Sequence, residues 1–174
     1  MTTDQINKGI AIAQALEKVV KEKGLPVNKL GLLMLQVAHE TGGFNSHVSD
    51  VLNMSGIKWN PKGKIVKGEY DSGIKSPEGN NYSGFDTVES WANRYTNIIG
   101  GYKTKPLDAN NVADFALRLK KSGYFTAPLD DYTHGLNSWT ATLKKYIGKI
   151  PFPVTIAAGS LVVLLIVSLL IINQ

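Results

Sequence analysis

The chain has 174 residues, a formal net charge of +5, 17 glycines and no cysteine, and 43% of its residues are hydrophobic. This composition excludes a collagen, a disulfide-stabilised scaffold and a low-complexity disordered chain, and the lack of cysteine excludes a thiolate zinc site. The length corresponds to about one domain. All charged side chains lie between Asp4 and Lys149, so the average composition hides a charged segment and an uncharged C-terminal segment.

The first 150 residues predict a mainly α-helical domain. Apolar residues recur every three or four positions over residues 3–23, and Gly24 and Pro26 follow as stop signals. The apolar stripe expected for this first helix is Ile6, Ile10, Ala13, Leu16 and Val20. Its spacing predicts one face that is buried against the rest of the domain.

A second helix is predicted from Asn28, as N-cap, to the segment Glu40-Thr41-Gly42-Gly43, where glycine permits the left-handed turn that closes a helix. Its expected buried stripe is Leu30, Leu33, Met34, Val37 and Ala38. Periodicity then fades over residues 53–84, which predict either short strands around residues 64–70 or a long surface loop with a small hairpin. Helical patterns return at residues 88–99, 111–121 and 131–146.

The uncharged C-terminal segment predicts a single transmembrane helix. The 19 residues 154–172 contain only Thr155, Ser160 and Ser168 as polar residues. As a helix they span roughly 28 Å, which is close to the hydrocarbon thickness of a bilayer. We therefore expect two parts: a domain of residues 1–150, and a proline-containing joint with an anchor over residues 151–174. Lysines flank the N-terminal side of the span, which predicts that the domain faces the cytoplasm.

Glu40 is the first candidate catalytic residue because it stands at the end of an apolar helix. Desolvation by apolar neighbours and the negative end of the helix dipole would both raise the pKa of its carboxyl group. A carboxylic acid that is still protonated near neutral pH can protonate a glycosidic oxygen. On spacing alone, a solvated surface glutamate remains the alternative interpretation.

Four segments resemble those of lysozyme-like peptidoglycan hydrolases. Residues 37–45, VAHETGGFN, are similar to the catalytic Glu-Ser/Thr-Gly segment of these enzymes. Residues 53–58, NMSGIK, resemble the Asn-Leu-Phe-Gly-Ile-Lys segment of the β-N-acetylglucosaminidases of glycoside hydrolase family 73. Residues 85–90, FDTVES, and residues 122–128, SGYFTAP with Tyr132, resemble two further segments of that family. The resemblance covers about residues 6–146 and leaves the apolar tail unexplained.

This resemblance implies a lysozyme-like helical fold with a small β-hairpin or loop lobe, and cleavage of a glycan strand between sugar units. It gives Glu40 the role of general acid and Tyr124 that of active-site tyrosine. Glu69 is the best match for a second carboxylate, with Glu78 and Asp71 as competing carboxylates of the same region. If Glu69 does not act, the N-acetyl group of the substrate could assist, or a single-acid lytic transglycosylase reaction could operate.

The resemblance leaves other reaction types open. The string His39-Glu40-Thr41 also looks like a segment of family 19 chitinases and their phage endolysin relatives, and a muramidase would use the same acid. No cofactor is implied. The spacing of His39 and His47 fits no compact zinc site, so no metal ligands are assigned.

Three residues are candidates for substrate binding: Asn53, Trp59 and Tyr132. Asn53 could bind an N-acetyl group or cap local backbone, and Trp59 is the preferred residue for stacking against a sugar ring. Tyr132 belongs to the last matched segment. Other aromatic residues on helical patterns are expected in the core: Trp91, Tyr95 and Trp139.

The expected partners are the glycan strand of peptidoglycan and a lipid bilayer, through residues 154–172. Lysines are spread along the chain and no nucleic-acid motif is present, so no nucleic acid is expected. The oligomeric state stays open. We expect a membrane-anchored peptidoglycan hydrolase, a phage lytic or virion-associated enzyme in the host inner membrane or a viral internal membrane. A bacterial autolysin is the alternative origin. A catalytically silent wall-binding or structural membrane protein is the alternative from another class.

Overall fold

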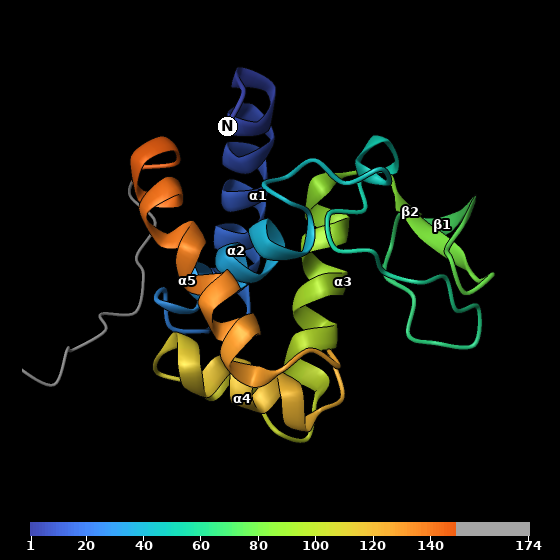
Figure 1. Ribbon diagram of the computed structural model, residues 1–174. Coiled ribbons are helices and arrows are strands. Elements are labelled where there is room, and N and C mark those ends of the chain that lie inside the picture. Colours follow the sequence, from blue (N-terminus) through green and yellow to red (C-terminus); the bar gives the residue numbers. More distant parts are fainter. Residues whose placement is uncertain (149–174) are drawn as a thin grey trace, which may run out of the picture.

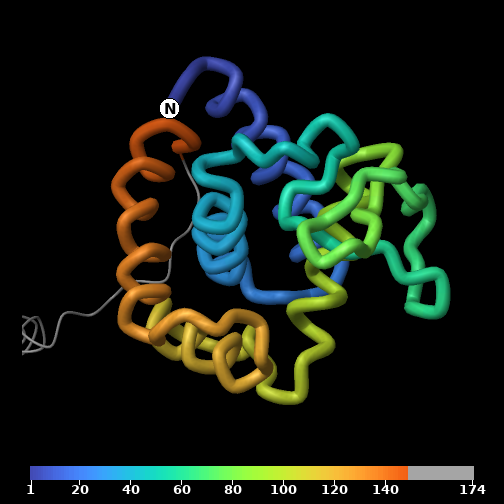
Figure 2. The backbone as a smooth tube through the Cα atoms, turned by 45° about the vertical axis from the view of Figure 1, so that its right-hand side comes forward, coloured from blue at the N-terminus to red at the C-terminus, as the bar shows by residue number. Residues whose placement is uncertain are grey.

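Helix α2 (Lys29–Glu40) is the centre of the fold (Figure 2). In this computed structural model, which describes residues 1–148, every residue from 29 to 38 is buried. Helices α1 (Thr3–Glu22) and α5 (Leu129–Tyr146) pack directly against it. All five residues of the predicted buried stripe are buried, and the buried surface of α2 extends beyond them because neighbours surround this helix. Asn28 occupies the predicted N-cap position, but its side chain makes no capping hydrogen bond.

Helix α1 begins with a capping box. The Thr2 hydroxyl accepts a hydrogen bond from the Gln5 backbone N–H at 3.2 Å, and the Gln5 side chain accepts one from the Thr2 N–H at 2.8 Å. The buried face of α1 is Gly9, Ile12, Leu16, Val19 and Val20. Of the predicted stripe, only Leu16 and Val20 belong to this buried face, and Ile10 is 38% exposed. The face that packs is the one that contacts both α2 and α3 (Val88–Gly101).

The remaining helices lie close to their predicted bounds. Helix α3 starts after Thr87, whose hydroxyl accepts the Ser90 N–H at 3.0 Å, and α4 (Val112–Lys121) starts after Asn111, whose side chain accepts the Asp114 N–H at 2.8 Å. The short 3₁₀ helix η2 (Pro106–Asp108) joins them. Helix α5 then packs on both α2 and α4, so the helices enclose α2 (Figures 1 and 2).

A β-hairpin lobe stands to one side of the helices, beyond α3 (Figure 1). Strands β1 (Glu69–Lys75) and β2 (Asn81–Phe85) are antiparallel, with Glu69 opposite Phe85 and Lys75 opposite Asn81. An isolated bridge joins Lys58 to Tyr82 of β2, and the 3₁₀ helix η1 (Ser49–Val51) contacts β2. The mainly α fold with a small hairpin lobe is confirmed. Of the two alternatives for residues 53–84, the loop with a small hairpin is confirmed, because β1 begins only at Glu69 and residues 64–68 are not in a strand.

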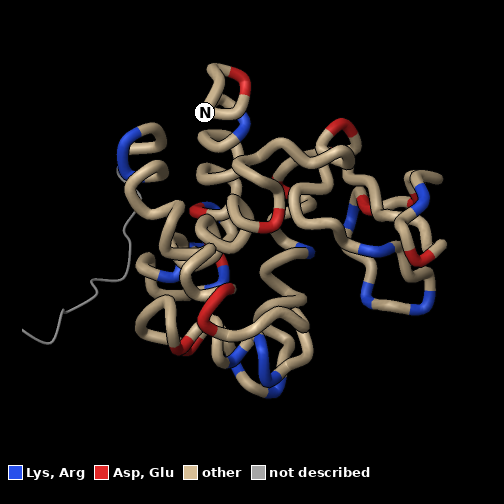
Figure 3. Tube along the Cα trace, viewed as in Figure 1, with Lys and Arg blue, Asp and Glu red and all other residues tan. Residues whose placement is uncertain are grey.

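The predicted transmembrane span, residues 154–172, and the predicted joint that precedes it lie outside the described residues. The predicted domain boundary at residue 150 also lies outside them. Within residues 1–148, none of the helices combines the length and the apolar character needed to cross a bilayer. Lysine and arginine residues occur along the helices and the hairpin lobe alike, interspersed with acidic residues (Figure 3).

Candidate active site

A groove of about 1010 Å³ lies between the helices and the hairpin lobe. Its walls come from the end of α2, the loops within residues 41–48 and 55–60, one side of α3, and Gly123 with Tyr124. Among the residues that the structure describes, the charged side chains that line it are Glu40, Lys58, Glu78 and Arg94. Carboxylates, cations and aromatic rings thus meet in one groove, as a site for polar sugar chains requires.

Glu40 is the last residue of α2, and its side chain is exposed at the groove wall. The helix ends here as predicted, because Gly42 and Gly43 have positive φ values of 58° and 84° and the Gly43 N–H bonds to the Ala38 carbonyl at 2.8 Å. The expectation that apolar side chains bury the Glu40 carboxyl is wrong. The apolar residues before it face the core, whereas Glu40 leaves the helix toward the groove.

The Glu40 carboxyl is held by a tyrosine from the other end of the chain. The Tyr132 hydroxyl donates to Oε1 of Glu40 at 2.8 Å. Tyr132 itself is fixed by a stacked contact with Phe125 and an edge contact with His39, with ring centroids 3.6 Å and 4.8 Å apart. Tyr132 is only 5% exposed and is not among the groove-lining residues. Tyr132 therefore contacts the candidate acid, and its role in substrate binding stays a prediction.

A buried amide links two more tyrosines one helical turn before Glu40. Gln36 is 0% exposed, accepts a hydrogen bond from the Tyr95 hydroxyl and donates one to the Tyr124 hydroxyl at 2.5 Å. Burial raises the pKa of Tyr95, Tyr124 and Tyr132 above the usual value, and the nearby Glu40 charge raises it further. These phenols therefore keep their protons at neutral pH and act as hydrogen-bond donors. Tyr124 lines the groove, as its predicted role requires.

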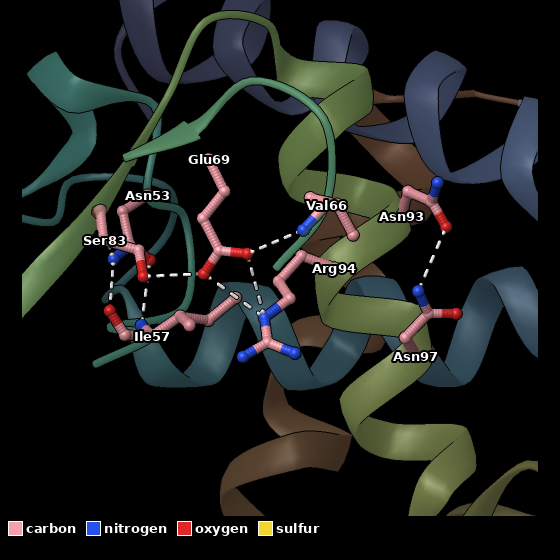
Figure 4. A network of polar contacts seen from close by, with 8 residues as sticks. All are labelled: Asn53, Ile57, Val66, Glu69, Ser83, Asn93, Arg94 and Asn97. Atoms are coloured by element: carbon pink, nitrogen blue, oxygen red, sulfur yellow. Dashed lines mark hydrogen bonds and ion pairs between the residues drawn. The ribbon is translucent and has the colours of Figure 1, made fainter. Parts of the chain in front are cut away.

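Glu69 occupies a different environment from the one expected of a loop glutamate (Figure 4). It is the first residue of β1, and its side chain is 0% exposed. Its two oxygens accept hydrogen bonds from the Ser83 hydroxyl at 2.9 Å and the Val66 N–H at 3.2 Å, and both lie within 3.2 Å of Nε of Arg94. Arg94 lines the groove and Glu69 does not. The carboxylate thus lies behind the arginine, with its acceptor sites occupied.

The two competing carboxylates of the lobe, Glu78 and Asp71, differ in their position relative to the groove. Glu78, in the turn between the strands, lines the groove and pairs with Lys58. The hydrogen bond from the Lys58 ammonium lowers the pKa of Glu78 to about 2. Asp71 lies on β1 away from the groove lining, and hydrogen bonds from the Asn81 side chain and the Gly73 N–H lower its pKa. Glu78 is therefore the lobe carboxylate that reaches the groove, and it is ionised there.

Asn53 serves the backbone of the lobe, the second of the two roles that the sequence left open. Its side chain is 0% exposed. Its Nδ2 donates to the carbonyls of Ile57 and Ser83 at 2.8 and 2.9 Å, and its Oδ1 accepts the Ile57 N–H at 2.9 Å. Its polar atoms thus hold residues 53–57 against β2, and the assignment of Asn53 to substrate binding stays a prediction without support from these contacts.

Trp59 is half-buried and does not belong to the groove lining, although its neighbours Lys58 and Asn60 do. Its backbone N–H bonds to the Asn81 carbonyl at 2.8 Å, which aligns this segment with β2. The sugar-stacking role predicted for Trp59 therefore finds no support in the groove geometry. Of the aromatics expected in the core, Trp91 and Tyr95 are buried and Trp139 is partly buried.

Sequence analysis did not identify Gln36 or Arg94. Gln36 carried a signal, because it is the one amide in the buried run of α2 and stands four residues before Glu40. No sequence signal pointed to Arg94, because an arginine on a helix is usually solvated. Within residues 1–148, no group of three or more histidine, aspartate or glutamate side chains could hold a metal ion.

Several solved structures share this fold. A peptidoglycan hydrolase from Sphingomonas sp. A1 aligns with a TM-score of 0.63 at 19% sequence identity, over 89% of this chain and 99% of its own. The glycoside hydrolase domain of Salmonella typhimurium FlgJ aligns with a TM-score of 0.59 at 18% identity, over 99% of this chain and all of its own. The catalytic domain of the autolysin Auto from Listeria monocytogenes aligns with a TM-score of 0.55 at 19% identity, over 84% and 89% of the two chains.

No protein-family model and no curated protein matches the sequence. The chain therefore shares the fold of these peptidoglycan hydrolases, and at 18–19% sequence identity the likeness concerns the fold alone. The resemblance that the four motifs indicated is confirmed at that level.

Proposed function

We propose that the protein is a peptidoglycan hydrolase that cleaves the glycan strand with Glu40 as general acid. The observation that carries this proposal is the Glu40 carboxyl, which stands exposed in the groove with Oε1 held by the Tyr132 hydroxyl. Within the described residues, Oε2 accepts no hydrogen bond, so it is the oxygen available to carry the proton to the glycosidic bond. The shared fold with peptidoglycan hydrolases supports the choice of substrate.

The hydrogen bond from Tyr132 has a catalytic consequence in this proposal. As the glycosidic C–O bond breaks, Glu40 gives its proton to the departing oxygen and becomes a carboxylate. A hydrogen bond to a charged acceptor is stronger than one to a neutral acceptor, so the Tyr132 contact strengthens as the reaction proceeds. Contacts that strengthen toward the transition state raise the rate of the chemical step.

Tyr124 is proposed to bind the substrate in the same groove. Its oxygen accepts the Gln36 amide N–H, which leaves its own O–H to donate to a sugar oxygen. Gln36 in turn is held by Tyr95, so the direction of the Tyr124 hydroxyl is set by a buried network. We assign Tyr124 as a substrate-contacting residue and Gln36 as its positioning residue.

Water activation is the step for which residues 1–148 place no ordinary general base in the groove. Glu69 is enclosed behind Arg94, and Glu78, with a pKa of about 2, is a weak base near neutral pH. We therefore propose that Glu78 acts as a fixed negative charge. A lytic transglycosylase reaction is the second candidate function, and the burial of Glu69 favours it because one acid–base residue is enough for that reaction.

We also propose that the protein is anchored in a membrane, in a phage or a bacterial setting, through residues 154–172. The sequence supports this proposal by its 19 residues without a charge. The full-length chain should remain in the membrane fraction after carbonate extraction, and a Leu164→Arg/Leu165→Arg variant should be released. Leu117→Arg, on the exposed side of α4, makes the same type of substitution once outside the segment and is the control. A parent chain that is extracted would contradict anchoring.

The activity is tested with the full-length chain in detergent on purified peptidoglycan, with mass spectrometry of the released fragments. Reducing N-acetylglucosamine ends identify a glucosaminidase, N-acetylmuramic acid ends a muramidase, and anhydro ends a lytic transglycosylase. Glu40→Gln should lower the rate by roughly 100- to 10,000-fold. The control is Glu89→Gln, because Glu89 is an exposed carboxylate paired with Lys18. A folded parent that binds peptidoglycan and releases nothing would favour the silent wall-binding alternative.

A further inference from the structure

The two arginines of the chain are used in different ways. Arg118, on α4, pairs through Nε with Asp114 at 2.8 Å, and its Nη1 donates to the carbonyls of Thr104 and Lys105 at 3.1 and 3.2 Å. Its guanidinium thus ties the loop before η2 to α4. Arg94 makes only the Nε contact with Glu69. Within residues 1–148, its two terminal nitrogens have no hydrogen-bond partner.

Glu69 fixes the direction in which Arg94 presents these nitrogens. The carboxylate is buried and held by Ser83 and Val66, so the Nε side of the guanidinium is anchored to the lobe (Figure 4). The two terminal nitrogens point away from Glu69 in Figure 4. Because the guanidinium is planar and rigid, holding its Nε edge also orients its terminal nitrogens. A buried carboxylate therefore acts as the support of a groove-facing donor pair.

The position of Arg94 in the groove gives it a defined place along a bound strand. Arg94 and Ile98 stand four residues apart on α3, and Tyr102 follows directly after its last residue; all three line the groove. Arg94 is nearest the hairpin lobe, and Tyr102 lies at the other end, edge-on to Tyr124 with ring centroids 6.2 Å apart. The α3 side of the groove thus runs from charged through apolar to aromatic.

Arg94 is also distinguished from the other cation of the groove. Lys58 is paired with Glu78, which lines the same groove, whereas the partner of Arg94 lies behind the groove wall. A ligand that reaches Arg94 therefore meets N–H donors and no competing carboxylate from Glu69. A pair of parallel N–H donors matches the two oxygens of a carboxylate.

We propose that the terminal nitrogens of Arg94 bind a carboxylate of the peptidoglycan strand at the lobe end of the groove. This inference rests on the proposed function. The carboxylate has two sources: the lactyl group of N-acetylmuramic acid, when no peptide is attached, or the peptide stem. Chitin has neither group, so Arg94 would distinguish peptidoglycan from chitin and fix the direction in which the strand lies. Glu69 is the positioning residue of this contact.

The test uses two matched substrate pairs with the full-length protein. The first pair is peptide-free glycan strands and the same strands with their lactyl carboxylates converted to methylamides. The second is intact peptidoglycan and peptidoglycan with its stem carboxylates converted in the same way. The variant is Arg94→Lys, which keeps a cation beside Glu69 but lacks the pair of terminal nitrogens. Arg118→Lys is the matched control, and thermal unfolding verifies that each variant is folded.

The parent should cleave the charged member of one pair roughly tenfold faster than its amidated partner, through KM, because a charge-assisted contact is lost on amidation. Arg94→Lys should remove that preference, and Arg118→Lys should keep it. A preference confined to peptide-free strands assigns the lactyl carboxylate, and one confined to intact peptidoglycan assigns the stem. Equal rates on both members of both pairs, or a preference that survives in Arg94→Lys, overturn the inference.

Failure of the proposed function gives a different result. If the parent cleaves none of the four substrates, calorimetric binding of the same pairs still tests Arg94, because the contact concerns binding alone. Parent binding that is tighter for the charged strands, with the difference lost in Arg94→Lys, supports the carboxylate site on a protein without hydrolase activity. Equal binding of both members of each pair overturns it.

Discussion

The two sides of the groove are built from different chemistry. On the helical side the contacts are neutral: the exposed Glu40 carboxyl accepts the Tyr132 hydroxyl, and one helical turn earlier the Gln36 amide bonds to the hydroxyls of Tyr95 and Tyr124. On the lobe side, two carboxylates form ion pairs, Glu69 with Arg94 and Glu78 with Lys58. The stabilising contribution of the neutral contacts should change at alkaline pH, where phenols ionise, whereas that of the ion pairs should weaken in acid and in high salt.

Glu40 and Glu69 show what this difference means for one residue type. Glu40 is exposed, and within the described residues its single hydrogen bond comes from a neutral phenol, so its Oε2 can contact a substrate. Glu69 is buried and fully hydrogen-bonded, so its charge serves to hold the lobe against α3. A catalytic assignment therefore depends on what surrounds a glutamate more than on its place in a motif.

The largest expected effect is on stability, at Glu69. Glu69→Ala leaves the Arg94 guanidinium, only 12% exposed, without its partner, and should lower the free energy of unfolding by about 3–5 kcal/mol. Glu40→Ala should lower it by only about 1 kcal/mol, because Glu40 is exposed and the variant loses the single hydrogen bond from Tyr132. Urea unfolding at pH 7 measures both. Similar losses for the two variants would contradict the contrast between the two sides.

The second prediction concerns alkaline pH and the helical side. The pKa values of Tyr95, Tyr124 and Tyr132 are raised above 10.0 in the folded protein, so the unfolded chain loses these protons first. Stability should therefore fall as the pH rises above 10, by about 1.4 kcal/mol per tyrosine at pH 11.

The Tyr95→Phe variant isolates this effect. It should be less stable than the parent at pH 8, because Gln36 loses a partner, but its stability should fall less between pH 8 and pH 11. Lysine titration is common to both proteins and cancels in the comparison. Parallel curves for parent and variant would show that the Tyr95 phenol does not contribute to the alkaline loss.

The third prediction concerns the contact between Tyr132 and Glu40. Tyr132→Phe keeps the stacked ring but removes the hydroxyl that holds Oε1, and should lower kcat roughly tenfold with little change in KM. The measurement is the rate of fragment release from peptidoglycan. Tyr146→Phe, at the end of α5, is the control. An unchanged kcat would mean that Tyr132 does not assist the acid.

Sequence patterns predicted the helices well because helical spacing and caps are local. The end of α2 at Gly42 and Gly43 and the starts of α3 and α4 are set by residues within one turn. The buried face of α1 was predicted poorly, because apolar residues occur on more than one face and only the packing of α2 and α3 decides between them.

The site was only partly predictable for the same reason. Glu40 and Tyr124 were found through motifs. The contacts that define their surroundings join residues far apart in the chain: Tyr132 is 92 residues from Glu40, and Tyr124 is 88 residues from Gln36. The Arg94 partner of Glu69 lies 25 residues away, on another element. No local pattern reports such pairs.

The smallest expected effect is that of Glu78→Gln on stability, and it distinguishes the Glu78–Lys58 pair from the Glu69–Arg94 pair. The Lys58 ammonium lowers the pKa of Glu78 to about 2 from the usual 4.5, so this pair stabilises the folded protein above pH 4.5 and loses that contribution as the pH falls through 2. The stability difference between the parent and Glu78→Gln should therefore be constant above pH 4.5 and shrink below it. Both side chains are exposed, so the difference should be small and should disappear in 1 M salt, where the screening length is about 3 Å.

The effect of Glu69→Ala should persist in the same salt, because buried charges are screened much less than exposed ones. The measurement is urea unfolding of parent, Glu78→Gln and Glu69→Ala from pH 3 to 7, with and without salt. If salt removed the Glu69 effect as well, the Glu69–Arg94 pair would be open to water, and Arg94 could not be held in place for a ligand. Salt resistance at Glu69 together with salt sensitivity at Glu78 is therefore the result that the proposed role of Arg94 requires.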